Sequence, residues 1–192
     1  DPKNPYHLVA TDETLVIRSY VADGPARGIS VGMPNGISYC FDAEKSHVVF
    51  GWFGAFMDVG PDRGNGRGRG GRPNRTLGTR FSVGAGGFPV RIGEKKPSEV
   101  QFRGYRRAKK EDVSFRYDVD GVSVQQKISP AKAGVGLAYQ FTIEDAQSDV
   151  TFTVDREQVN AKATKGKWNG NELKLTSAEA KSFTVEVMQK YN

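Results

Sequence analysis

The sequence predicts an all-β chain, built mainly from antiparallel strands and folded as a β-sandwich. Short runs of β-branched and aromatic residues recur between glycine, proline and asparagine residues, which is the pattern of strands separated by turns. An Asp120-Gly121 pair joins two alternating runs and predicts a hairpin with a type I′ turn. No segment keeps a 3.6-residue apolar period, so long helices are not expected.

The first part of the chain contains four expected strands. Each is a short run rich in valine, isoleucine or aromatic residues, and turn-forming residues separate one run from the next. The expected strands are residues 14–21, 28–33, 37–41 and 48–53.

The second half of the chain begins with the clearest local signal, the hairpin of residues 113–119 and 122–128. Alternating or clustered apolar residues then continue to the end, and an Asn169-Gly170 pair marks a further turn. A short Ala/Glu/Lys cluster at 177–181 has room for only one turn of helix. The remaining expected strands are residues 136–143, 150–154, 159–163, 172–175 and 182–188.

The middle of the chain, residues 54–112, holds most of the glycine, proline and arginine, and it has weak strand signals only near 79–83 and 100–105. Large apolar side chains run through this segment, which a permanently solvated chain would not carry. We therefore expect a long ordered excursion that packs on a face or edge of the sheets. No internal repeat is present, and residues 1–192 are expected to form a single domain.

The positive charge of this 192-residue chain, a net +6 with a pI of about 9.4, is concentrated in two places. Residues 60–75 carry five arginines and one aspartate, and residues 103–110 carry five cations and no acid. The remainder is slightly acidic. This distribution predicts a local anion-binding surface and does not favour nucleic acid as the partner.

The Gly/Arg-rich segment 60–75 supplies the first candidate binding residues, Arg63, Arg67, Arg69 and Arg72. Guanidinium groups bind carboxylates through two parallel hydrogen bonds, so an acidic sugar or an acidic protein surface is the expected ligand. A structural interpretation stays open, in which these arginines pair with local carboxylates and only fix the loop.

Aromatic residues close to this segment supply two further candidates, Tyr39 and Trp52. A flat ring can stack against the apolar face of a pyranose, so both are expected as stacking platforms. Packing in the core is the alternative for each ring.

The catalytic and metal chemistry of the sequence is sparse. Asp58 and Asp62 are weak candidates for acid–base chemistry, because hydrolysis of a glycoside needs a second carboxyl group converging on the first. With two histidines and Cys40 as the one cysteine, no metal site, disulfide or haem attachment is expected. The sequence contains no nucleotide-binding motif and no apolar run long enough to span a membrane, and no cofactor is expected.

The runs at 28–42 and 51–60, followed by Gly70-Gly71-Arg72-Pro73, resemble an uncharacterised domain of exported multidomain proteins of planctomycete-type bacteria. The resemblance covers residues 24–120. In those proteins the domain accompanies c-type cytochrome and sugar-dehydrogenase-like modules. The resemblance implies a periplasmic or secreted location, neighbouring modules in a longer polypeptide and a supporting role in carbohydrate or redox metabolism, and it assigns no catalytic residue.

Together these features predict a non-catalytic binding or accessory domain that recognises a carbohydrate or an acidic partner through a cationic, aromatic-lined surface. Two alternatives remain at this point. One is a carbohydrate-active hydrolase with paired carboxylates, and the other is a structural module whose arginines serve only its own loops.

Overall fold

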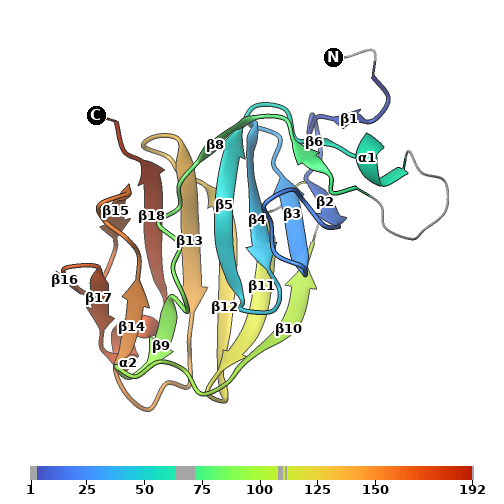
Figure 1. The fold of residues 1–192 in the computed structure, drawn as a ribbon. Coiled ribbons are helices and arrows are strands. Elements are labelled where there is room, and N and C mark those ends of the chain that lie inside the picture. Colours follow the sequence, from blue (N-terminus) through green and yellow to red (C-terminus); the bar gives the residue numbers. More distant parts are fainter. Residues whose placement is uncertain (1–3, 64–71, 108–109, 111, 192) are drawn as a thin grey trace.

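The computed structural model describes residues 4–63, 72–107, 110 and 112–191. Over these residues the strands form two stacked layers, with sheets packed face to face (Figure 1). All strand pairs within the sheets are antiparallel, which confirms the predicted all-β sandwich.

One layer is a single six-stranded sheet, and it contains the predicted hairpin. The turn is as expected, because Asp120 and Gly121 both have positive φ, at 47° and 79°. In sheet order the strands are β10 (Val100–Arg106), β11 (Val113–Val119), β12 (Val122–Pro130), β13 (Gly136–Thr142), β18 (Phe183–Gln189) and β15 (Val159–Ala163).

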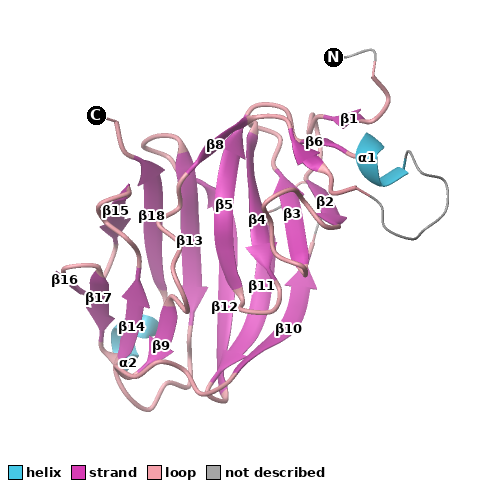
Figure 2. Ribbon diagram, in the orientation of Figure 1, coloured by secondary structure: helices cyan, strands magenta, loops and turns pink. Residues whose placement is uncertain are grey.

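The other layer is made of two sheets that lie side by side (Figure 2). The five-stranded sheet has the order β2 (Leu15–Arg18), β3 (Gly28–Gly32), β4 (Ile37–Asp42), β5 (His47–Phe53) and β8 (Thr79–Phe81). The four-stranded sheet has the order β16 (Lys167–Asn169), β17 (Glu172–Leu175), β14 (Val150–Thr153) and β9 (Val90–Ile92).

A small third group lies beside the five-stranded sheet, near the N-terminus (Figure 1). It consists of β1 (His7–Leu8), β6 (Met57–Asp58) and β7 (Arg75–Thr76), with the short helix α1 (Gly60–Arg63) after β6. The second helix, α2 (Ser177–Ala180), is the single turn expected from the sequence. It begins at a capping box, in which the Thr176 side chain and the Glu179 side chain each accept a hydrogen bond from the other residue's backbone N–H.

The main core lies between the two layers and is rich in aromatic rings. Phe41 of β4 stacks on Phe115 of β11, with ring centroids 3.9 Å apart. At the other end of the sandwich, Phe141 of β13 contacts Phe152 of β14 at 5.4 Å. The six-stranded sheet therefore packs against both sheets of the facing layer. In β11 the inward residues are buried, while alternate residues face outward.

A second, smaller core covers the opposite face of the five-stranded sheet. Trp52 stacks on Phe56 there, with centroids 5.8 Å apart and ring planes within 2°, and its Nε1 donates a hydrogen bond to the Phe56 carbonyl at 2.7 Å. Met57 and Val59 complete the cluster with Val21 and Cys40. Because both faces of this sheet are covered, every residue of β4 is buried.

The middle segment, residues 54–112, is more regular than the sequence suggested. Over its described parts it is ordered and lies largely along the edges of the sheets, as expected. It supplies β6 and β7 to the small sheet, β8 to the five-stranded sheet, β9 to the four-stranded sheet and β10 to the edge of the six-stranded sheet.

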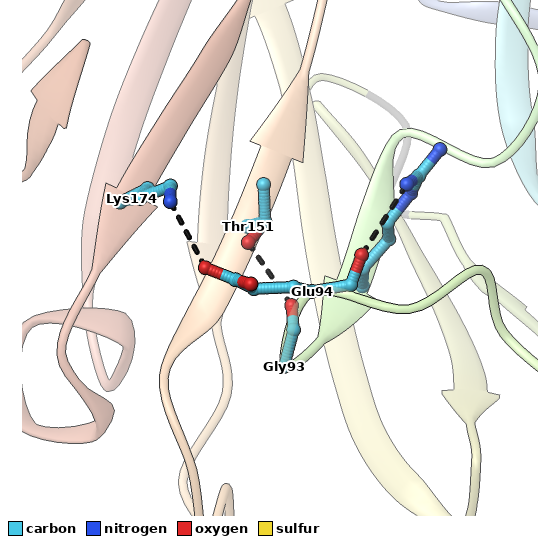
Figure 3. Close-up of polar contacts among 5 residues, drawn as sticks. Gly93, Glu94, Thr151 and Lys174 are labelled. Atoms are coloured by element: carbon cyan, nitrogen blue, oxygen red, sulfur yellow. Dashed lines mark hydrogen bonds and ion pairs between the residues drawn. The ribbon is translucent and has the colours of Figure 1, made fainter. Parts of the chain in front are cut away.

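Side-chain hydrogen bonds connect the residues just after β9 to β14 and β17 of the same sheet (Figure 3). The Thr151 hydroxyl donates to the Gly93 carbonyl at 3.0 Å, and the Lys174 ammonium donates to Glu94 Oε1 at 2.9 Å. These contacts join the middle segment to β14 and β17. Side-chain hydrogen bonds therefore hold this segment in place in addition to the backbone pairing of β9 with β14.

Candidate anion-binding surface

Basic side chains gather on the outward face of the six-stranded sheet, at its β10 edge. The strand register places Arg106 opposite Ser114, and Ser114 opposite Lys127. Two residues further along β11, Arg116 lies opposite Gln125. Residues that are paired across antiparallel strands share one face of a sheet, so these side chains form a single surface. We call Arg106, Ser114, Arg116, Gln125 and Lys127 the basic face.

A β-bulge in β10 hollows the basic face. The register shifts between Phe102 and Gly104, so one extra residue is inserted there. Gly104 has a φ of +116°, and nothing lies within 4 Å of where a Cβ would stand. A hollow of about 220 Å³ opens at this place. Its lining residues are Arg103, Gly104, Tyr105, Arg106, Ser114, Phe115, Arg116 and Gln125.

A second, wider hollow of about 660 Å³ continues from the first. The two share Arg106, Ser114 and Gln125, so they form one depression along the sheet. The residues that line only the second hollow are Arg107, Lys110, Asp112 and Lys127. The whole depression is therefore lined by cations interspersed with amide and hydroxyl groups.

Most of this charge is not neutralised by the described part of the chain. Arg103 is paired, since its Nε and Nη2 both lie 2.8 Å from Asp118 Oδ2. No described carboxylate forms an ion pair with Arg106, Arg116 or Lys127. Like charges on neighbouring strands repel, so a bound anion would relieve an unfavourable interaction that the free protein carries.

Asp112 is the one acidic residue among the described residues that line the depression. Burial raises the pKa of its carboxyl group, and the positive charge of Lys127 acts in the opposite direction. When Asp112 is ionised it lowers the positive potential of the basic face. The charge of the depression therefore depends on pH.

The two aromatic residues expected as stacking platforms are in the interior. Tyr39 and Trp52 are both 0% exposed. Tyr39 packs on Phe115 in the main core, and Trp52 belongs to the second core on the opposite face of the same sheet. Both rings are covered because this sheet is buried on both sides, so neither offers a surface to a sugar in this structure.

Three of the four arginines expected to bind a ligand have side chains outside the described part of the structure. Arg67 and Arg69 fall outside the described residues. Arg63 ends helix α1, where only its backbone is described, and Arg72 is exposed. None of these residues is among those that line the depression.

The two weak catalytic candidates do not form a described pair. Asp58 Oδ2 lies 3.6 Å from His7 Nε2, and its Oδ1 accepts a hydrogen bond from the Gly60 N–H. Asp62 lies in α1, where only its backbone is described. No group of three metal-ligating side chains occurs among the residues that the structure describes.

Sequence reasoning noted the cations at 103–110 but did not assign them a site. Their partners on the basic face, Arg116 and Lys127, belong to alternating strands of the predicted hairpin. The signal that could have located the face is this alternation, which places Arg116 and Lys127 on the side opposite the apolar residues.

Comparisons of the chain with protein-family models, with curated proteins and with solved structures gave no significant match. Within the described residues, neither helix is long and apolar enough to cross a membrane.

Proposed function

We propose that this chain is a non-catalytic binding or accessory domain, and that it binds an acidic carbohydrate through the basic face. The observation that carries the proposal is the group of three cations without a described ion-pair partner, Arg106, Arg116 and Lys127, around a depression in an open sheet face. Guanidinium groups in this arrangement suit carboxylate or sulfate groups.

The other groups on the basic face favour a carbohydrate over a smooth acidic protein surface. Ser114 and Gln125 place a hydroxyl and an amide between the cations, and such groups can exchange hydrogen bonds with sugar hydroxyls. Among the described residues, none of those that line the depression is a large, exposed apolar residue. Charge and hydrogen bonding, and not stacking on an exposed ring, would therefore provide most of the affinity.

The proposed setting is an exported protein, in the periplasm or outside the cell, beside other modules of a longer polypeptide. The resemblance of residues 24–120 to domains of exported planctomycete-type proteins supports this location and a supporting role in carbohydrate or redox metabolism. The basic face is compatible with that role because it presents a ligand-sized depression on the six-stranded sheet.

The hydrolase alternative has less support. A glycosidase needs two carboxyl groups flanking the bond that is cleaved. The described lining of the depression offers Asp112 alone, and Asp58 is engaged with His7 elsewhere in the fold. The purely structural alternative predicts that the five arginines of segment 60–75 are paired. Of these, Arg72 and Arg75 have described side chains, and neither forms an ion pair with a described carboxylate.

The test is a titration of the purified domain with polygalacturonate, at low and at high salt, with a neutral glucan and poly-glutamate as comparison ligands. The variant Arg106→Gln/Arg116→Gln removes two cations from the basic face. The control variant Lys132→Gln/Lys162→Gln removes the same charge from exposed sites elsewhere.

We expect polygalacturonate to bind, with an affinity that falls as salt rises. The face variant should weaken binding by about tenfold or more for each guanidinium removed, while the control stays close to wild type. Equal binding by the face and control variants would overturn the proposed site. Preference for poly-glutamate over polygalacturonate would move the ligand class to acidic proteins.

A further inference from the structure

A separate pocket opens at the side of the sandwich where the two layers meet. It lies between strands β2 and β3 of one layer and the edge strand β10 of the other, and its volume is about 280 Å³. Its lining residues are Arg18, Ser19, Tyr20, Ala26, Arg27, Gly28, Ile29, Ala43 and Phe102. None of these residues lines the depression of the basic face.

The pocket combines an apolar interior with a cationic, exposed rim. Ile29 and Ala43 are buried members of the main core, at 2% and 6% exposure, and Phe102 packs against the same core. Arg18 and Arg27 are exposed, and Tyr20 is 52% exposed. The lining thus presents apolar surface beside two guanidinium groups, which is the chemistry that a small ring with one negative charge requires.

The two guanidinium groups of the rim have no described carboxylate partner. The nearby Asp23 pairs with Arg80 instead, at 3.7 Å, and Asp42 is 3.9 Å from His47. Arg18 is held at the pocket by a cation–π contact, in which its Cζ lies 5.2 Å from the ring centroid of Tyr105. One cation is therefore positioned in advance, and both keep donors available for an anion.

We infer that this pocket binds a small sugar acid, a single ring that carries one carboxylate. The carboxylate would lie between Arg18 and Arg27, with the ring against Tyr20 and the apolar lining. The volume is slightly below the range of about 300–1,000 Å³ typical of pockets for drug-sized ligands, which suits one monosaccharide better than a longer chain. The inference does not depend on the function proposed for the basic face, because the two sites share no residue.

The test uses glucuronate as the probe, followed by NMR chemical shifts and by calorimetry, with glucose and inorganic sulfate as comparisons. Glucose keeps the ring and lacks the charge, whereas sulfate keeps a charge and lacks the ring. The variants are Arg27→Gln, Arg27→Lys and Tyr20→Ala, which change exposed side chains, and Arg75→Gln is the control.

We expect saturable glucuronate binding that shifts the resonances of Tyr20 and Ile29, with glucose and sulfate each binding more weakly. Arg27→Gln should lower the affinity about tenfold, and Arg27→Lys should lower it less because the charge remains. Arg75→Gln and the basic-face variant Arg106→Gln/Arg116→Gln should bind glucuronate like the wild type. The inference is overturned if glucuronate shows no saturation up to about 10 mM, or if Arg27→Gln binds it unchanged.

Discussion

The guanidinium of Arg18 lies over the ring of Tyr105, with its Cζ 5.2 Å from the ring centroid. This contact joins β2, the edge strand of one layer, to β10, the edge strand of the other. A hydrogen bond of 2.9 Å from Arg107 Nη2 to the Thr14 carbonyl makes a second connection on the same side. The two contacts link the layers at the edge where both the basic face and the sugar-acid pocket are located.

Replacing Arg18 with glutamine should destabilise the domain slightly. The variant loses the cation–π contact with Tyr105, which at an exposed site is worth about 0.5–1 kcal/mol. Arg27→Gln is the matched control, because it removes the same charge from the same pocket and has no described aromatic ring beneath it. Urea denaturation of both variants measures the difference. Equal free energies of unfolding for the two would show that the Arg18–Tyr105 contact adds nothing.

The bulge glycine Gly104 should not tolerate a side chain. Its φ of +116° is a conformation that residues with a Cβ rarely adopt, so Gly104→Ala should cost about 1–3 kcal/mol of folding free energy. Gly86→Ala is the control, since a Cβ there also meets nothing within 4 Å and the backbone is not in the positive-φ region. Guanidinium chloride denaturation compares the two variants.

A Gly104→Ala variant as stable as Gly86→Ala would mean that the bulge relaxes without strain. If the bulge is strained as expected, the variant should also lose affinity for polygalacturonate, because any relaxation of β10 moves Arg103 and Arg106 relative to Arg116.

The fold class and the long strands could be predicted because their signals are local. Alternating residues and a two-residue turn predict the 113–128 hairpin, and the structure confirms it. The strands that were missed, such as β6 (Met57–Asp58), β7 (Arg75–Thr76) and β9 (Val90–Ile92), contain only two or three residues. So short a run has no measurable periodicity, and pairing with distant strands determines its conformation.

The candidate site was harder to predict because it depends on what covers each face of a sheet. Tyr39 and Trp52 look available in the sequence, but they are buried by segments far away in the chain, including Phe115 for Tyr39. The basic face brings together Arg106, Arg116 and Lys127 from three strands. Their sequence spacing shows that Arg116 and Lys127 face outward, but only the register of β10 shows that Arg106 joins them.

Replacing Asp112 with asparagine should strengthen anion binding and remove part of its pH dependence. Burial raises the pKa of Asp112 above its ordinary value, so its carboxyl group becomes charged only as pH rises through that raised value. In the wild type, the attraction of the basic face for an anion therefore weakens as the fraction of ionised Asp112 increases. The asparagine side chain of the variant would stay neutral at every pH.

Dextran sulfate is the suitable ligand for this measurement, because its sulfate groups stay ionised from about pH 4 to about pH 7, where carboxyl groups titrate. Wild-type binding should weaken over this interval, and binding by Asp112→Asn should be tighter and change less. Parallel pH profiles for the two proteins would show that Asp112 does not control the potential of the basic face. Glu94→Gln serves as the control, because Glu94 does not line the depression and instead accepts a hydrogen bond from Lys174.

His47 should make the fold less stable in mild acid. Its side chain is buried, its Nδ1 has no hydrogen-bond partner among the described residues, and its Nε2 lies 3.9 Å from Asp42 Oδ2. Burial lowers the pKa of His47 below its ordinary value of 6.5, and the negative charge of Asp42 acts in the opposite direction. The unfolded chain therefore binds a proton more readily than the folded one between the lowered value and about 6.5.

The contribution of His47 to stability is complete above a pH of about 6.5 and is lost as pH falls through that window. The measurement is the free energy of unfolding by urea at a series of pH values, for the wild type, His47→Gln and His7→Gln. The glutamine of His47→Gln cannot take up a proton. In this variant the free energy of unfolding should therefore fall less steeply as pH is lowered, whatever the absolute stability of the variant. His7→Gln keeps His47 and should retain the steeper fall, so an acid slope that is unchanged in His47→Gln would refute the assignment.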